Sequence, residues 1–182
     1  VNGGSGSDTI ITGSGNDTVN AGSGNDYVDS GSGDDVVSGG SGHDYIETGS
    51  GSDTASGNGG DDVISSGTGN DTVDGGYGDD LIFAGAGDDV VDGGAGHDII
   101  FSGDGHDTVN AGAGDDIVLA GYGNDIVDGG TGRDYIHGGA GDDTITGGED
   151  NDFIDGGSGI DTAVFAGNLA DYQIIQTYSN TF

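Results

Sequence analysis

The chain has 182 residues, of which 45 are Gly and 34 are acidic, and its formal net charge is −33, with Arg133 as its single Lys or Arg. This composition argues against nucleic acid and anionic membrane surfaces as partners, because both are bound through Lys and Arg. The absence of Cys excludes disulfides and thiolate metal sites. We therefore expect cations that prefer oxygen ligands, calcium first among them, as partners.

Gly and like charges both oppose a compact fold, so some further interaction must offset them. No signal peptide and no apolar run of membrane length is visible, and Val1 already lies beside a repeat. We expect the chain to be part of a longer protein.

A nine-residue repeat runs from Gly3 to Val164 without insertion or deletion, which gives eighteen units. The first two units read GGSGSDTII and TGSGNDTVN, and the last, GGSGIDTAV, begins at Gly156. We divide the chain into a repeat array, residues 1–164, and a segment of different composition, residues 165–182.

The sixth position of the repeat is Asp in every unit, and neither packing nor solubility requires an acidic residue there. A ligand role explains this constancy, because ionised carboxylates are good calcium ligands. The predicted side-chain ligands are Asp8, Asp17, Asp26, Asp35, Asp44, Asp53, Asp62, Asp71, Asp80, Asp89, Asp98, Asp107, Asp116, Asp125, Asp134, Asp143, Asp152 and Asp161.

Positions two and four are Gly except at Asn58 and Asp150. After Gly, Asn and Asp tolerate left-handed backbone dihedrals best, so both positions are predicted to have φ > 0. The hexapeptide GGxGxD then forms a tight turn whose carbonyls can point at a common centre. Positions seven to nine read as a very short strand, with Val or Ile at position eight in sixteen units.

One apolar residue in nine cannot form a core alone, so we expect units to stack in pairs across a shared seam of Val and Ile. Position one supports this pairing, because Gly39, Gly57 and Gly75 alternate with Thr48 and Ser66. Eighteen residues then form one turn. Nine turns at about 4.8 Å each give a rod roughly 40 Å long.

These tandem GGxGxDxUx units resemble the RTX calcium-binding repeats of secreted bacterial toxins, proteases, lipases and adhesins. The resemblance implies an all-β fold, a right-handed parallel β-roll (a two-sheet β-solenoid) with calcium ions between turns. It also implies backbone carbonyl ligands, which we assign to Gly6, Gly15, Gly24, Gly33, Gly42, Gly51, Gly60, Gly69, Gly78, Gly87, Gly96, Gly105, Gly114, Gly123, Gly132, Gly141 and Gly159. Two stacks of nine loops enclose up to about sixteen ions, whose charge would nearly cancel −33.

The resemblance further implies an extracellular, secreted or surface-attached module that folds when calcium binds, after type I secretion of a larger toxin, protease, lipase, adhesin or surface-layer protein. The alternative is a surface- or ice-binding adhesin region, since flat solenoid faces with Thr and Asn rows can bind ice. No catalytic residue is predicted, and the chain is not expected to be an enzyme. His43, His97, His106 and His137 occupy variable positions and are interpreted as surface residues.

Two further features lie outside the repeat consensus. Phe165, Leu169, Tyr172, Ile174 and Ile175 make residues 165–182 a predicted C-terminal cap over the open end of the solenoid. Outward apolar residues of the odd-numbered units are predicted to stack on one sheet as an apolar face. A neighbouring domain, the C-terminal segment or a second copy could cover this face, or its residues could serve only strand propensity. Its members are Leu81, Phe83, Ile99, Phe101, Ile117 and Leu119.

Overall fold

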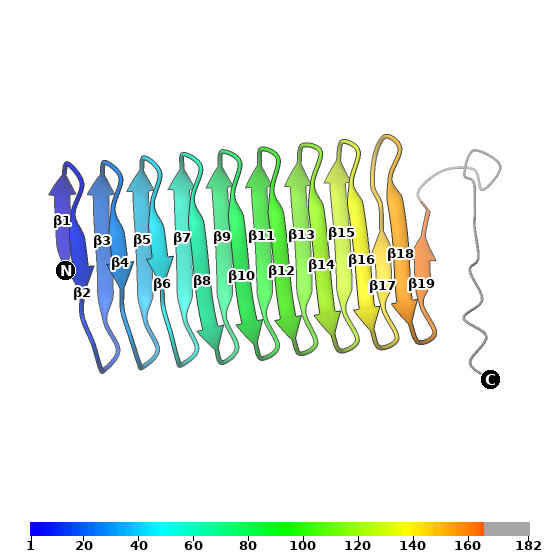
Figure 1. The fold of residues 1–182 in the computed structure, drawn as a ribbon, viewed down its shortest axis with the longest axis horizontal. Coiled ribbons are helices and arrows are strands. Elements are labelled where there is room, and N and C mark those ends of the chain that lie inside the picture. Colours follow the sequence, from blue (N-terminus) through cyan, green and yellow to red (C-terminus); the bar gives the residue numbers. More distant parts are fainter. Residues whose placement is uncertain (166–182) are drawn as a thin grey trace.

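The computed structural model describes residues 1–165, and within them the chain is all-β. Two parallel sheets lie face to face and the chain passes from one to the other in every half turn (Figure 1). The result is a solenoid of about nine turns, which confirms the predicted β-roll architecture. The predicted C-terminal cap lies outside the described residues, apart from Phe165.

The two sheets take alternate strands of the chain. The ten-stranded sheet, called sheet A, contains β1 (Asn2–Ser5), β3 (Thr18–Ser23), β5 (Val36–Ser41), β7 (Thr54–Gly59), β9 (Thr72–Tyr77), β11 (Val90–Ala95), β13 (Thr108–Ala113), β15 (Ile126–Thr131), β17 (Thr144–Thr146) and β19 (Thr162–Val164). The nine-stranded sheet, called sheet B, contains β2 (Thr9–Ile11), β4 (Tyr27–Asp29), β6 (Tyr45–Glu47), β8 (Val63–Thr68), β10 (Leu81–Ala86), β12 (Ile99–Asp104), β14 (Ile117–Tyr122), β16 (Tyr135–Ala140) and β18 (Phe153–Ser158).

Strand pairing has a constant register of eighteen residues. Ile82 of β10 pairs with Ile64 of β8 on one side and with Ile100 of β12 on the other. One turn of the solenoid therefore contains two repeat units, as the alternation at position one predicted. Like residues consequently stack upon like along the whole rod.

Most strands are longer than predicted. The sequence predicted strands at positions seven to nine, whereas β9 runs from Thr72 to Tyr77 and so continues through position three of the next unit. The continuation passes through Gly76, whose φ is 104°. Because Gly94 stacks directly on Gly76 with nearly the same φ, the ladder of pairing survives the bend. Local propensity could not reveal this, since a left-handed Gly usually ends a strand.

The predicted left-handed dihedrals are confirmed at positions two and four of all eighteen units. Asn58 and Asp150 have φ of 74° and 75°, so the two exceptions to Gly adopt the same backbone conformation. A second constraint also requires Gly. A Cβ added to Gly87 would lie 1.9 Å from the carbonyl oxygen of Gly69 in the preceding turn. Close stacking of loops therefore excludes a side chain there.

The core lies between the sheets and consists mainly of position eight from both of them, with Ala residues at position one. Sheet B contributes mostly Ile and sheet A mostly Val, and nearly all are fully buried. Position one also points inward, which the sequence did not predict. A Cβ on Gly93 of sheet A would lie 3.2 Å from the Cδ1 atom of Ile100 in sheet B. Gly in sheet A thus makes room for the larger Ile of sheet B.

The outer faces of the two sheets differ. On sheet B, Leu81, Ile99 and Ile117 form one row, and Phe83, Phe101 and Leu119 form a second, as predicted. The rings of Phe83 and Phe101 stack with their centroids 5.1 Å apart. Sheet A shows mainly Thr, Ser, Asn and Asp. Residues 1–165 include no helix, and hence no helix that could span a membrane.

Candidate metal centre

The hexapeptide loops form two columns, one along each edge of the solenoid. Loops of odd-numbered units lead from sheet A to sheet B, and loops of even-numbered units lead back from sheet B to sheet A. The eighteen-residue register places each loop directly on the loop of the same edge in the next turn. Each column therefore brings equivalent oxygens together at every turn.

The position-six Asp of one loop holds the loop of the preceding turn through one carboxylate oxygen. The backbone N–H of Asp62 donates to Oδ1 of Asp80, and the N–H of Asp80 donates to Oδ1 of Asp98, both at 2.8 Å. The same bond recurs at every described turn on both edges, between 2.7 and 3.1 Å. One oxygen of each carboxylate is thus committed to the loop stack.

The other carboxylate oxygen, Oδ2, is buried and has no hydrogen-bond partner. A buried ionised oxygen without a partner is unfavourable by several kcal/mol, and a bound cation is the usual remedy. Asp152 and Asp161, near the C-terminal end of the array, are more exposed and do not share this feature. The unpartnered oxygens belong to Asp8, Asp17, Asp26, Asp35, Asp44, Asp53, Asp62, Asp71, Asp80, Asp89, Asp98, Asp107, Asp116, Asp125, Asp134 and Asp143.

Burial makes the carboxylates of the loop columns difficult to ionise. Burial raises the pKa of Asp80 to about 7, with further contributions from the charge of Asp62 in the preceding turn and from Asp61. Burial likewise raises the pKa of Asp89 to about 7 and that of Asp98 to about 6. Hydrogen bonds from the backbone oppose these rises without cancelling them. Near neutral pH the column can remain ionised only at a large free-energy cost.

The position-four carbonyls, predicted as ligands, are available to an ion. Within residues 1–165 none of them accepts a hydrogen bond, whereas the carbonyls of positions three and six are used in the loop stack. The oxygen of Gly6 lies 2.3 Å from where a Cβ on Gly24 would be, so it points toward the next loop. The assignment of individual carbonyl ligands stays a prediction.

The ligand set must combine side chains with backbone. In the described part of the chain, no group of three or more His, Cys, Asp or Glu side chains converges on one point. Each loop contributes one inward carboxylate, so the remaining ligands must be uncharged oxygens, such as those of backbone carbonyls. An all-oxygen set of this kind suits calcium and does not suit zinc, which prefers His and Cys.

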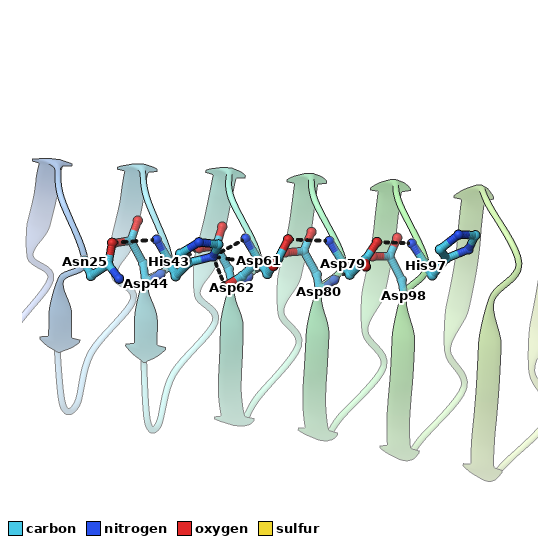
Figure 2. A network of polar contacts seen from close by, with 9 residues as sticks. All are labelled: Asn25, His43, Asp44, Asp61, Asp62, Asp79, Asp80, His97 and Asp98. Atoms are coloured by element: carbon cyan, nitrogen blue, oxygen red, sulfur yellow. Dashed lines mark hydrogen bonds and ion pairs between the residues drawn. The ribbon is translucent and has the colours of Figure 1, made fainter.

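Position five has a function that the sequence did not reveal. Its side chain accepts a hydrogen bond from the position-five N–H of the next turn (Figure 2). The side chain of Asn25 accepts from the N–H of His43, and that of His43 accepts from the N–H of Asp61. Asp79 likewise accepts from the N–H of His97. Thirteen residues at this position, all of them Asn, Asp or His, accept this bond, a regularity that residue variability concealed.

In the position-five bond the N–H of one loop donates to the preceding loop, and in the position-six bond the N–H donates to the next loop. The two bonds therefore join successive loops in opposite directions. At position five, the side chains of Arg133 and Ile160 have no acceptor atom. Arg133 instead donates to Oδ2 of Asp115 at 2.8 Å, on the exposed surface. The interpretation of the His residues as surface residues is incomplete, because His43, His97 and His106 act as acceptors in this column.

Comparison with known proteins agrees with this geometry. A model of the RTX calcium-binding nonapeptide repeat, four copies long, matches residues 2–37, 38–73, 65–100, 74–109, 101–136 and 128–163. Among curated proteins none matches the chain significantly. The matched segments cover nearly all of the array, and the buried, unpartnered Asp oxygens are what a calcium-binding repeat requires. The chain therefore belongs to the family of RTX calcium-binding nonapeptide repeats and is a calcium-binding β-roll module.

Proposed function

We propose that, near neutral pH, this β-roll folds only when calcium binds, and that it is a scaffold or spacer within a larger secreted protein. The observation that supports the proposal is the set of sixteen Asp carboxylates whose Oδ2 atoms are buried and lack a partner. Without a cation these oxygens repel one another and lose hydration. With calcium they become ligands, and the same burial stabilises the folded state.

Charge balance supports a high stoichiometry. The formal net charge is −33, and two columns of loops enclose up to about sixteen ions, which supply nearly equal positive charge. Extracellular calcium modules have dissociation constants of about 10⁻⁴ to 10⁻³ M, so cytosolic calcium would leave the sites empty and the chain unfolded. Export would then couple to folding.

The repeat family occurs in secreted bacterial proteins, which supports an extracellular location. The parent would be a toxin, protease, lipase, adhesin or surface-layer protein, with its activity in another domain and none in this array. The apolar face of sheet B, where Phe83 and Ile99 are 39% and 37% exposed, would contact a neighbouring domain or a second copy.

Circular dichroism at pH 7.5, in calcium and in excess chelator, tests the folding claim. We expect a β-rich spectrum only with calcium, and a return to it when calcium is restored. A β-rich spectrum that persists after complete chelation would refute calcium-coupled folding. A titration in which one or two ions complete folding would refute the high stoichiometry.

A pair of variants separates ligand loss from charge loss. Asp80→Asn removes a buried carboxylate of the loop column, whereas Asp128→Asn removes an exposed carboxylate from the outer face of sheet A. Both remove one negative charge. We expect weaker calcium binding only for Asp80→Asn, because only Asp80 lies in a loop. Equal effects of the two variants would mean that net charge alone controls folding.

A further inference from the structure

Five of the nine even-numbered loops contain a hydroxyl at position one, which none of the odd-numbered loops has. Position one of the even-numbered loops, on sheet B, points into the interior of the solenoid. Four of these hydroxyl residues are fully buried, and Thr12, in the first turn, is partly buried. The residues with this hydroxyl are Thr12, Ser30, Thr48, Ser66 and Ser102.

The proton of each hydroxyl is already in use. Ser66 donates to the carbonyl oxygen of Ala84 at 2.7 Å, and Ser102 donates to that of Ala120 at 2.8 Å. The other three hydroxyls donate in the same way to position one of the next turn. A hydroxyl has one donor and two acceptor lone pairs, so the lone pairs of the oxygen remain available.

Position one lies directly beside the unpartnered carboxylate oxygen of its own loop. A Cβ added to Gly57 would lie 2.3 Å from Oδ2 of Asp62, and one added to Gly75 would lie 2.6 Å from Oδ2 of Asp80. Ser66 has a side chain at this place, next to Asp71. Oδ2 of Asp71 nevertheless has no hydrogen-bond partner, because the Ser66 proton is directed to the next turn.

The same closeness holds on the even-numbered edge, where Gly138 occupies position one. A Cβ added to Gly138 would lie 2.4 Å from Oδ2 of Asp143 in the same loop. Side chains at position one of the even-numbered loops therefore lie beside the unpartnered carboxylate oxygen.

We infer that the hydroxyl oxygens at position one are additional calcium ligands, so that five even-numbered loops form a second kind of calcium site with one more oxygen. This inference rests on the proposed calcium-dependent folding. Packing alone does not require the hydroxyls, because Ala84 and Ala120 occupy the same buried place and are fully buried themselves. The common feature of the five loops is an oxygen beside Oδ2.

A crystal structure grown in saturating calcium tests the assignment at each loop. We expect the Ser66 and Ser102 hydroxyl oxygens at about 2.3–2.6 Å from a calcium ion, the usual ligand distance. Calcium ions present in the loops with these oxygens well outside that distance would overturn the inference and leave the proposed function intact. Loops without any calcium would overturn the proposed function itself.

Matched variants test the same point in solution. The double variant Ser66→Ala with Ser102→Ala removes two hydroxyls and introduces a residue that the chain already tolerates at this place. The double variant Ala84→Ser with Ala120→Ser adds two. In calorimetric calcium titrations we expect affinity at the two altered loops to fall about three- to tenfold in the first variant and to rise in the second.

Circular dichroism in saturating calcium serves as the folding control for both variants. Calcium titrations that superimpose for wild type and both variants would show that the hydroxyls only complete the core. A rise in affinity on loss of the hydroxyls would also overturn the inference, because it would mean that they compete with calcium for the carboxylate.

Discussion

Acidification of the calcium-free chain should promote its folding. The perturbation is a shift of pH from 7.5 to 4.5 in excess chelator. Seven position-six carboxylates have a pKa of about 6 or 7 in the folded chain, well above their ordinary 3.8. The folded chain therefore binds protons more tightly than the unfolded chain, and lower pH favours folding.

The size of the effect follows from the individual groups. A pKa raised from 3.8 to about 6, as for Asp98, corresponds to about 3 kcal/mol of folding free energy. Three or four such carboxylates already match the net stability of a typical domain, about 5–15 kcal/mol. This stabilisation is fully present below about pH 4 and is lost as pH rises through about 6 to 7, so the ionised chain without calcium should be unfolded at pH 7.5.

Circular dichroism across pH 4 to 8, with chelator and with saturating calcium, measures the effect. We expect β structure to disappear between about pH 5 and 7 with chelator and to persist to pH 8 with calcium. Sodium chloride at matched ionic strength should not replace calcium at pH 7.5, because buried carboxylates are screened little. A calcium-free chain equally folded at pH 5 and 7.5 would refute the reasoning.

Three further outcomes are expected. Gly87→Ala should lower the melting temperature of the calcium-bound chain, because φ is 140° at Gly87 and a Cβ there would lie 1.9 Å from a carbonyl oxygen. Gly59→Ala should change the melting temperature little, because a Cβ at Gly59 would meet no atom within 4 Å. Ile82→Ala should lower the free energy of unfolding by about 2–5 kcal/mol in denaturant titrations, because Ile82 is fully buried. The double variant Phe83→Ser with Phe101→Ser should leave calcium affinity unchanged and reduce any association of the chain seen by light scattering. If mass and stability are both unchanged, these residues only favour strand formation and do not form an interface.

The sequence alone determined the repeat, its pairing and its ligand type. Asp at every sixth position and Gly at the second and fourth are local requirements of a loop, so they can be read from one unit. The two exceptions, Asn58 and Asp150, predicted the dihedral sign that the structure shows. Position eight predicted a shared core because a single Val or Ile per unit has nothing else to pack against.

Contacts between turns required the tertiary structure. Strands extend past position nine because Gly76 stacks on Gly94 and not because of any local propensity. The acceptor function of position five depends on the loop eighteen residues further on, so Asn, Asp and His appear there as unrelated substitutions.

The state of the Asp carboxylates was also decided by the fold. Sequence identified them as acidic ligands, but only the stacked loops show that one oxygen of Asp80 holds the preceding turn while the other is buried without a partner. Local chemistry fixes which atoms can bind a cation. Burial and stacking across turns decide which of them need one, because the cost of desolvating a charge exists only in the assembled solenoid.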